Sequence, residues 1–401
     1  MKRLAIAVLT IAAMAWAAPA DAKNGRVKIG ILHDASGPYS QNQGPGDVVA
    51  VRLALEDFGK QVLGQDIEVV FADHQNTTDV GTLVARRWFD VEDVDVIMGL
   101  GNSAVALAVQ QLAREKDKIS IPIAASASSI TGKQCSPNGF HWVHNTYNLA
   151  NSIARALTKS GGDTWYFVTA DYAFGHALES DARKVVEQTG GKVVGRVLHP
   201  AFTPDLSSFL LQARGSGAKV IGLANAGIDT VNSLKQAREF GIGRDGKQKL
   251  GALLFLITDV HGAGLDVAQG INTVEAFYWD QNDETRAFSK RWEADMKRPP
   301  TMYHAGTYSA VNHYLKAVKA AGTDETKAVI AKMREIPIND FMTKNGKIRA
   351  DGHVMRDMYV FEVKKPSESK GAWDLLKQVA VIPAEDAALP VSESECPLLK
   401  K

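Results

Sequence analysis

The chain has 401 residues, and its 46 lysine and arginine side chains almost balance its 45 aspartate and glutamate side chains. This balance excludes the basic footprint of a nucleic-acid-binding protein and gives no attraction to an anionic membrane surface. A chain of this length exceeds a single ordinary hydrophobic core, so we expect two lobes.

The first residues have the pattern of an export signal. Lys2 and Arg3 precede an apolar run from residue 4 to 18, and Ala20-Asp21-Ala22 is a small-x-small cleavage site. A transmembrane anchor is the alternative, but the run spans about 15 residues where about 20 are needed to cross a bilayer. We predict that residues 1–22 are a signal peptide, that the protein is exported to the periplasm, and that no segment inserts into the membrane.

Short β-branched runs then alternate with amphipathic stretches, which is typical of α/β proteins with parallel sheets. The expected strands of the first lobe are 27–32, 67–71, 94–98 and 119–123. The expected helices between them are 46–58, 77–90 and 103–114.

The same alternation begins again after residue 145 and predicts a second, similar lobe. Its expected strands are 164–168, 192–197, 220–223 and 252–257, with helices at 149–159, 176–188, 209–215 and 229–240. Further on, 277–280 is expected as a strand or a crossing segment, followed by helices at 285–296, 305–321 and 324–333 and strands at 358–363 and 373–381. The predicted fold is α/β, with two Rossmann-like lobes whose parallel sheets are flanked by helices.

The chain contains two cysteines, Cys135 and Cys396, both in polar, turn-like contexts. An oxidising periplasm favours a disulfide between such a pair. Two unpaired thiols are the alternative. A zinc site is not expected, because neither cysteine has histidine or cysteine neighbours at metal-binding spacing.

A glycine-rich segment, Gly99-Leu100-Gly101-Asn102-Ser103-Ala104, lies between an expected strand and an expected helix. The G-x-G-x-x-A pattern occurs in dinucleotide sites, but the acidic residue that such sites need about 20 positions later is missing. Asn102 and Ser103 instead place a hydroxyl and free backbone N–H groups at a helix N-terminus, where an anion can bind.

The next strand also ends in a hydroxyl-rich loop, which includes Ser126, Ser128 and Ser129. Loops at the carboxyl ends of adjacent parallel strands meet, so the two segments together predict a cradle for a carboxylate. The alternative for Ser103 and Ser128 is a role as helix N-caps.

In the second lobe, Tyr172 and Phe174 follow the first expected strand and are positioned to close over a ligand. Asn225 follows the strand at 220–223, and Asp259 follows the strand at 252–257, where a carboxylate can receive a ligand ammonium. The alternatives are ordinary core or surface aromatics for Tyr172 and Phe174, and a helix N-cap for Asp259.

Enzyme motifs are missing from the sequence. There is no G-x-S-x-G elbow, H-E-x-x-H pair or Walker A loop. The ten histidines are scattered, and no two of them have metal-ligand surroundings. We therefore predict neither catalysis nor a metal or other cofactor.

Three segments resemble a known family. They are 27–32 with Ser36-Gly37-Pro38-Tyr39, then Asp171-Tyr172-Ala173-Phe174-Gly175, and finally Phe202-Thr203-Pro204-Asp205-Leu206-Ser207-Ser208-Phe209-Leu210. They are similar to the first strand and S-G-P loop, the aromatic-glycine loop, and the D-F-S-S-x-L segment of branched-chain amino-acid-type (Leu/Ile/Val-binding) periplasmic proteins of ABC importers. Together the matches extend over most of the chain.

The resemblance implies the type I periplasmic binding fold, in which two lobes joined by a three-crossing hinge close on a ligand. On that pattern, lobe 1 is 23–144 with 281–352, and lobe 2 is 145–280 with 353–401. The resemblance also implies a small-molecule ligand and an ABC permease of the inner membrane as partner, and we expect a monomer.

Family positions in lobe 1 fall on the hydroxyl-rich loops. Ser103 stands where a family hydroxyl holds the ligand carboxylate, and the stretch from Ser126 to Ser129 matches the G-A-T loop that does the same. Tyr39 lies near the aromatic residue of the first loop.

In lobe 2, the family positions are an aromatic side chain that covers the ligand and an acidic side chain that binds it. Phe174 matches the aromatic residue that covers the ligand, with Tyr172 two residues earlier. Asp259 falls on the acidic residue that receives the amino group.

The chain also departs from the family. Gln75 and Asn102 occupy the positions of the family's lobe-1 disulfide, so Cys135 and Cys396 are expected to replace that bridge. The loop Ala224-Asn225-Ala226-Gly227 stands where the family has an aromatic-rich loop, which puts a leucine-like ligand in doubt. The ligand classes left open are amino acids, aromatic acids, amides, urea and dicarboxylates.

We predict a non-enzymatic binding protein that closes about a hinge on a small carboxylate-bearing molecule. The ligand docks first on lobe 1, and lobe 2 then closes. A ligand sensor and an enzyme of the same fold are the alternatives. The predicted ligand-binding residues are Tyr39, Asn102, Ser103, Ser126, Ser128, Ser129, Tyr172, Phe174, Asn225 and Asp259.

Overall fold

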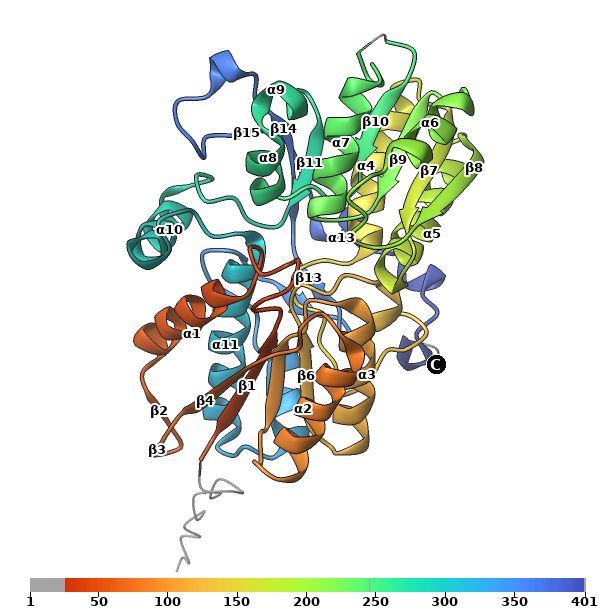
Figure 1. The fold of residues 1–401 in the computed structure, drawn as a ribbon. Coiled ribbons are helices and arrows are strands. Elements are labelled where there is room, and N and C mark those ends of the chain that lie inside the picture. The colour runs from red at the N-terminus through yellow and green to blue at the C-terminus, as the bar shows by residue number, and fades with distance from the viewer. Residues whose placement is uncertain (1–25, 245, 400–401) are drawn as a thin grey trace, which may run out of the picture.

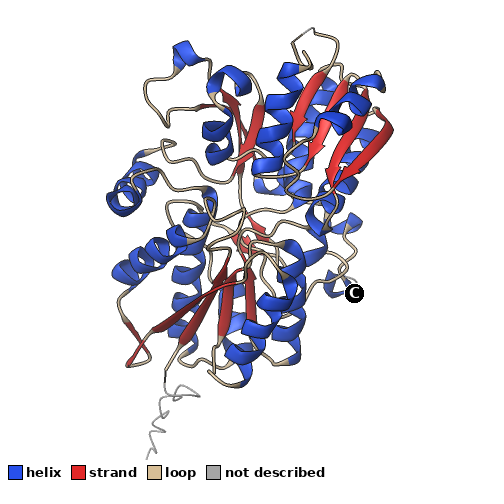
Figure 2. Ribbon diagram, viewed as in Figure 1, coloured by secondary structure: helices blue, strands red, loops and turns tan. Residues whose placement is uncertain are grey.

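A computed structural model describes residues 26–244 and 246–399, which fold into two lobes placed one above the other (Figure 1). The predicted signal peptide, residues 1–22, lies outside the described residues. In both lobes, helices cover the two faces of a central sheet (Figure 2).

The lower lobe is built on a parallel four-stranded sheet of order β4-β1-β5-β6. Its strands are β1 (Lys28–His33), β4 (Glu68–Asp73), β5 (Val96–Gly99) and β6 (Ile119–Pro122), with a small hairpin of β2 (Gln61–Val62) and β3 (Gln65–Asp66). Its helices are α1 (Pro45–Phe58), α2 (Thr78–Asp90), α3 (Ser103–Glu115), α10 (Asp283–Met296), α11 (Met302–Ala321) and α12 (Thr326–Glu335). Helices from late in the chain thus complete the first lobe.

The upper lobe holds a second parallel sheet of order β10-β9-β7-β8. Its strands are β7 (Thr164–Ala170), β8 (Lys192–His199), β9 (Val220–Ala224) and β10 (Lys249–Ala252). Its helices are α4 (Thr146–Lys159), α5 (Ala173–Gln188), α6 (Ser207–Gly215), α7 (Ile228–Glu239), α8 (Ile257–Ala263) and α9 (Leu265–Ala268). An antiparallel sheet of β11 (Asn272–Glu275), β14 (Met358–Val363) and β15 (Leu376–Ile382) stands beside it (Figure 1).

The inner strands are buried except at the first residue of β1 and of β7, which explains their apolar sequences. Every residue of β5 and of β9 is buried, whereas β8 at the sheet edge alternates exposed and half-buried residues. Parallel strands covered by helices on both faces need apolar side chains on both sides. The α/β prediction from the sequence is therefore confirmed.

Several connections pass between the lobes. Residues 143–145 lead from the lower lobe into α4, residues 276–282 lead from β11 to α10, and the small pair β12 (Lys347–Ile348) and β13 (Val354–Met355) precedes β14. A bridge between His141 and His353 holds the first and last of these connections side by side. The lobe boundaries stay a prediction, although these crossings lie near 144/145, 280/281 and 352/353.

The C-terminal segment after β15 returns towards the lower lobe. It contains α13 (Ala384–Ala387) and short 3₁₀ turns at Val391–Glu393 and Pro397–Leu399, following an earlier one at Pro366–Glu368. Cys396 is bonded to Cys135, with 5.7 Å between the Cα atoms, so the predicted disulfide is confirmed. The bond joins two segments that the family pattern assigns to different lobes.

One expected strand is wrong. The sequence predicted a strand over 252–257, but β10 ends at Ala252 and α8 begins at Ile257. The residues between them, Leu253 to Leu256, are buried without being in the sheet. Their apolar run fits a buried strand and a buried loop equally well, because periodicity does not separate the two.

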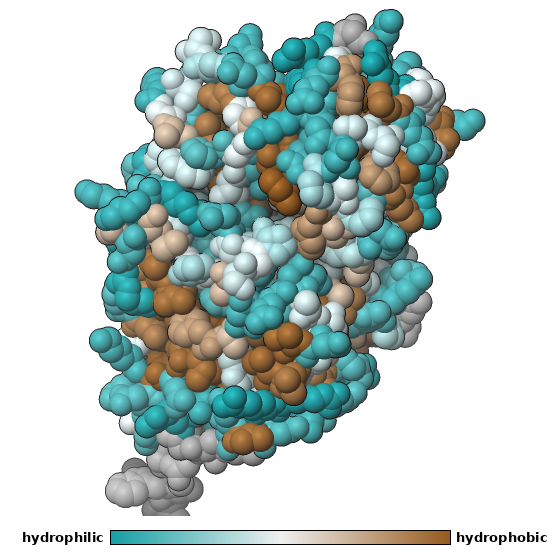
Figure 3. All heavy atoms as spheres, viewed as in Figure 1, coloured by the Kyte–Doolittle hydropathy of each residue, from teal (hydrophilic) through white to brown (hydrophobic). Residues whose placement is uncertain are grey.

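The visible surface mixes hydrophilic residues with separate apolar patches, several of them on the lower lobe (Figure 3). Isolated patches of this kind are normal for a folded domain. In the described part of the chain, no helix has the length and apolar character required to span a membrane.

Candidate functional site

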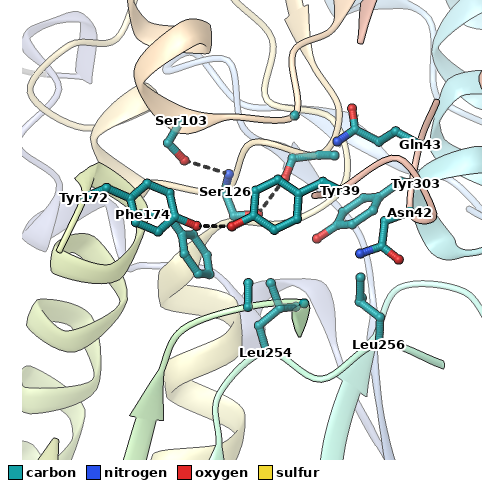
Figure 4. A pocket seen from close by; sticks show the side chains of 14 residues that line it. Tyr39, Asn42, Gln43, Ser103, Ser126, Tyr172, Phe174, Leu254, Leu256 and Tyr303 are labelled. Carbon is teal, nitrogen blue, oxygen red and sulfur yellow. Dashed lines mark hydrogen bonds between the residues drawn. The ribbon is translucent and has the colours of Figure 1, made fainter. Parts of the chain in front are cut away.

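A small cavity lies where the two lobes face each other (Figure 4). It is formed by loops that follow strands of both parallel sheets, which is where open α/β sheets bind their ligands. The residues that line it are Tyr39, Asn42, Gln43, Gly101, Ser103, Ala124, Ser126, Tyr172, Phe174, Ala226, Gly227, Leu254, Leu256 and Tyr303. Five predicted site residues are therefore brought together: Tyr39, Ser103, Ser126, Tyr172 and Phe174.

Ser103 is positioned to donate a hydrogen bond into the cavity. It is the first residue of α3, and its Oγ accepts hydrogen bonds from the backbone N–H groups of Ser126 (3.3 Å) and Ala127 (3.2 Å). Since these contacts use the oxygen as an acceptor, the hydroxyl proton is left to donate. The Ser126 hydroxyl donates to the carbonyl of Ala124 at 3.0 Å.

Asn102 lies beside this site but does not line the cavity. Its side-chain oxygen accepts hydrogen bonds from the N–H groups of Ala104 (2.8 Å) and Val105 (3.3 Å), and its amide donates to Asn76. Asn102 is thus the N-cap of α3. Such a cap fixes the helix N-terminus, whose partial positive charge favours an anion in front of it.

Ser128 and Ser129 open a 3₁₀ turn that ends at Ile130, and neither lines the cavity. The backbone N–H of Ser128 donates to Thr146 Oγ1 at 3.0 Å, which ties the turn to the start of α4. Their predicted part in ligand binding stays a prediction.

An aromatic contact joins the lobes across the cavity (Figure 4). The hydroxyl oxygens of Tyr39 and Tyr172 are 2.6 Å apart, and the rings of Tyr172 and Phe174 lie 5.9 Å apart. Burial raises the pKa of both tyrosines, so each hydroxyl keeps its proton. Gly227, at a positive φ of 59°, lets the ring of Tyr39 approach, because a Cβ there would lie 3.3 Å from Tyr39 Cε1.

Asn225 lies behind the cavity wall. Its amide donates to Ser233 Oγ at 3.1 Å, and its oxygen accepts from Thr230 Oγ1 at 2.9 Å. These bonds hold the loop between β9 and α7, while the next two residues, Ala226 and Gly227, line the cavity. Direct ligand contact by Asn225 stays a prediction.

Asp259 also lies behind the wall, at the start of α8. Its Oδ2 accepts a hydrogen bond at 2.9 Å from the N–H of Leu256, which is the N-cap of α8, so Asp259 is the third residue of the helix and not its N-cap. Its contact with a ligand ammonium stays a prediction. Burial raises the pKa of Asp259 to about 7. Glu275 Oε1 accepts from the next N–H, that of Ile257, at 3.2 Å, and burial raises the pKa of Glu275 well above its usual value.

The cavity also contains residues that the sequence did not indicate. Leu254 and Leu256 come from the run that was expected as a strand, and Tyr303 comes from α11, far along the chain. Its hydroxyl lies 3.1 Å from His144 Nε2. Asn42 faces the cavity from the loop after β1 and accepts a hydrogen bond from Thr258 of the other lobe at 2.5 Å.

None of the cavity-lining side chains is charged. Elsewhere in residues 26–244 and 246–399, no three His, Cys, Asp or Glu side chains are grouped to hold a metal ion. The chemistry that this lining offers is hydrogen bonding from hydroxyl and amide groups together with apolar and aromatic contact.

Comparison with known proteins connects this geometry to a family. Residues 26–372 match the family described as periplasmic binding protein. The chain is 47% identical to a periplasmic binding protein of Burkholderia mallei, whose crystal structure superposes with a TM-score of 0.91 over 94% of this chain and 99% of that one. A branched chain amino acid ABC transporter periplasmic ligand-binding protein of Burkholderia xenovorans LB400 is 41% identical, with a TM-score of 0.85 over 93% and 100%.

Among curated relatives, the Leu/Ile/Val-binding protein homolog 7 of Brucella suis is 28% identical over 252 residues. That match spans 60% of this chain and 62% of the relative. The chain therefore belongs to the periplasmic binding protein family and has the type I fold of its branched-chain amino-acid-type members.

Proposed function

We propose that this protein is the periplasmic solute-binding component of an ABC importer and that it holds a small carboxylate-bearing molecule between its lobes. The observation that carries the proposal is the cavity itself, with most of its hydroxyl and amide groups on its lower face and mainly apolar and aromatic groups on its upper face. A mostly apolar pocket with a few placed polar groups is typical of small-molecule sites.

The carboxylate of the ligand is placed against the lower lobe. The Ser103 hydroxyl and the N-terminus of α3 supply hydrogen bonds and a favourable field for a negative charge. Neutral donors of this kind are sufficient for a buried carboxylate when they are already oriented before binding.

The body of the ligand faces Phe174, Leu254 and Leu256. No carboxylate lines the cavity, so an ammonium group on the ligand would have no charged partner there. An aromatic or other organic acid without an amine therefore fits this geometry better than an amino acid.

An amino acid is the second candidate, with Asp259 as the partner of its ammonium. It requires the loop 253–256 to move so that the carboxylate of Asp259 reaches the ligand. Binding of an amine through Asp259 would strengthen as the pH rises through about 7, where this carboxyl ionises.

The proposed delivery to an ABC permease depends on closure of the hinge, which brings surfaces of both lobes together. Contacts such as Tyr39 with Tyr172 exist when the lobes meet, so a partner that contacts both lobes distinguishes the closed form. We propose that the protein acts in the periplasm as a monomer without catalysis or cofactor. A sensor with the same clamp is the alternative.

The test is isothermal titration calorimetry of the mature protein with amino acids, aromatic acids, aliphatic acids and amides. We expect micromolar or tighter binding of an organic acid and its recovery unchanged after dissociation. Binding of amines alone would replace the first candidate by the second. Conversion of the ligand would show an enzyme, and no binding of any carboxylate would contradict the proposal.

A further inference from the structure

The C-terminal segment, residues 383–399, belongs to neither lobe's sheet and passes along the outside of the molecule. It begins where β15 ends beside the upper lobe, and its last part lies below α5 at the flank of the lower lobe (Figure 1). Side-chain contacts and the disulfide hold it to the rest of the protein.

Two helices of the upper lobe hold this segment. On α4, Asn148 Nδ2 donates a hydrogen bond to the carbonyl of Ala387 at 2.8 Å. On α5, Lys184 Nζ lies 2.7 Å from Glu393 Oε2, and Gln188 Nε2 donates to the same oxygen at 3.2 Å. The segment is therefore attached to the upper lobe at residue 387 and again at residue 393.

The end of the segment is bound to the lower lobe. Cys396 is buried and forms the disulfide with Cys135. The loop that carries Cys135 belongs to the lower lobe, because Gln110 of α3 donates a hydrogen bond to the carbonyl of Gln134 in that loop at 2.8 Å. The attachment thus changes from the upper lobe to the lower lobe between residues 393 and 396.

This path makes the segment a fourth connection between the lobes, beside the three crossings. Arg349, close to the crossing that precedes β14, donates to the carbonyl of Leu389 at 2.7 Å, so the segment follows the hinge. Ser394 is buried, and the chain from 393 to 396 is short. An extended chain allows at most about 3.6 Å per residue, so the Cα atoms of 393 and 396 cannot be more than about 11 Å apart.

We propose that residues 383–399 are a strap that limits how far the two lobes open. The lobes meet in this structure, where the hydroxyl oxygens of Tyr39 and Tyr172 are 2.6 Å apart. Tyr172 directly precedes α5, so a rotation that separates this pair also carries α5 away from the lower lobe. The strap, held to α5 through Glu393 and to the lower lobe through Cys396, then becomes taut.

The strap leaves closure free and shortens the range of opening. The ligand-free protein therefore stays nearer to its closed form, and less of the binding free energy is used to shift the population of conformations. The inference concerns the motion of the lobes and does not rest on the proposed function. Its test needs no ligand.

Small-angle X-ray scattering of the mature protein, dialysed out of denaturant so that no small molecule stays bound, tests the strap. Cys135→Ser combined with Cys396→Ser releases the end that is fixed to the lower lobe. We expect the radius of gyration to rise by about 1 Å from the roughly 21 Å of a compact chain of this length. A chain that ends at residue 390 and carries Cys135→Ser should also show a rise, and there no loose tail contributes to it.

A second variant tests the length of the strap with the disulfide intact. The sequence Gly-Ser-Gly-Ser, inserted between Ser394 and Glu395, lengthens the chain between the two attachments and keeps both of them. The radius of gyration should rise as in the cysteine variant. The same insertion between Lys370 and Gly371, two exposed residues outside the strap, is the matched control and should leave the wild-type value.

Each outcome decides for or against the strap. An unchanged radius of gyration in the cysteine variant overturns the proposal. A rise in that variant without one in the insertion variant also overturns it, because the disulfide is then a local staple whose distance from α5 has no effect. An equal rise in the control shows an effect that is not specific to this segment. Circular dichroism and the unfolding temperature check that each variant is folded, and the insertion variant decides if the cysteine variant is not.

Discussion

The two faces of the cleft differ in chemistry although they come from lobes of similar fold. The lower face presents polar side chains, Asn42, Gln43, Ser103 and Ser126, on loops that follow β1, β5 and β6. The upper face presents apolar and aromatic ones, with Leu254 and Leu256 on the loop after β10 and Phe174 at the start of α5. Loops that follow the strands thus carry different kinds of side chain in the two lobes.

The difference suggests separate tasks for the two faces of the cleft when the lobes close on a ligand. Under the proposed function, polar groups on the lower face select and orient the ligand, because directional hydrogen bonds define its position. The apolar upper face then removes water, and burial of apolar area contributes roughly 25 cal/mol per Å². Loss of water also strengthens the hydrogen bonds on the lower face.

The largest expected effect comes from making the upper face polar. Leu254→Asp places a carboxylate opposite the ligand, where burial and repulsion from the ligand's own charge both oppose binding. We expect affinity for an organic acid to fall about 100-fold or more, roughly 2.7 kcal/mol, by calorimetry. Leu83→Asp, at a leucine that is 70% exposed on α2, should leave the affinity unchanged. Equal affinity in Leu254→Asp would place the ligand elsewhere.

Asp259 and Glu275, which lie behind the upper face, should make the free energy of unfolding depend on pH. The pKa of Asp259 is raised to about 7, so the folded state keeps a proton that the unfolded state releases near pH 4, and stability falls as the pH rises between these values. Asp259→Asn should remove this contribution, about 2 kcal/mol between pH 5.5 and 7. Urea unfolding at both pH values measures it.

Glu275 remains in both proteins, and the direction of its pKa shift is the same. The difference between wild type and Asp259→Asn therefore reports Asp259 together with its electrostatic effect on Glu275. Parallel stability curves for the two proteins would show that Asp259 is ionised in the folded state at pH 5.5.

A smaller effect is expected from removing a donor on the lower face. Ser103→Ala deletes the hydroxyl that we assign to the ligand carboxylate, and affinity should fall about tenfold, as for a hydrogen bond to a charged group. Ser207→Ala is the matched control, because Ser207 is likewise the first residue of a helix and lies outside the cavity lining. Comparable affinity in Ser103→Ala and wild type would remove Ser103 from the site.

The smallest effect concerns the contact between the faces. Tyr39→Phe and Tyr172→Phe each delete the 2.6 Å hydrogen bond across the cleft, and each should weaken binding about fivefold, near 1 kcal/mol. The double variant should be little weaker than either single one, since all three lack the same bond. Tyr308→Phe, which loses a bond to Asp57 on the lower lobe, is the control. Additive losses in the double variant would contradict a shared bond.

Much of the fold was predictable because local pattern and tertiary structure agree there. The helix expected at 46–58 is α1 at Pro45–Phe58, and the helix expected at 103–114 is α3 at Ser103–Glu115. Inner strands are buried on both faces and are therefore continuous apolar runs in the sequence. The structure contains the predicted bond between Cys135 and Cys396. The pairing was predictable because the chain has no other cysteine.

The sequence by itself determined the α/β lobes, the disulfide and which loops reach the cleft, since loops after parallel strands meet at one sheet edge. Only the tertiary structure shows which residues of each loop line the cavity. Asn225 and Asp259 form hydrogen bonds within the upper lobe and do not line the cavity, whereas Leu254 and Leu256 do. Gln43 and Tyr303 join it only because lobes and distant helices pack together, and such contacts leave no periodic signal in a single sequence.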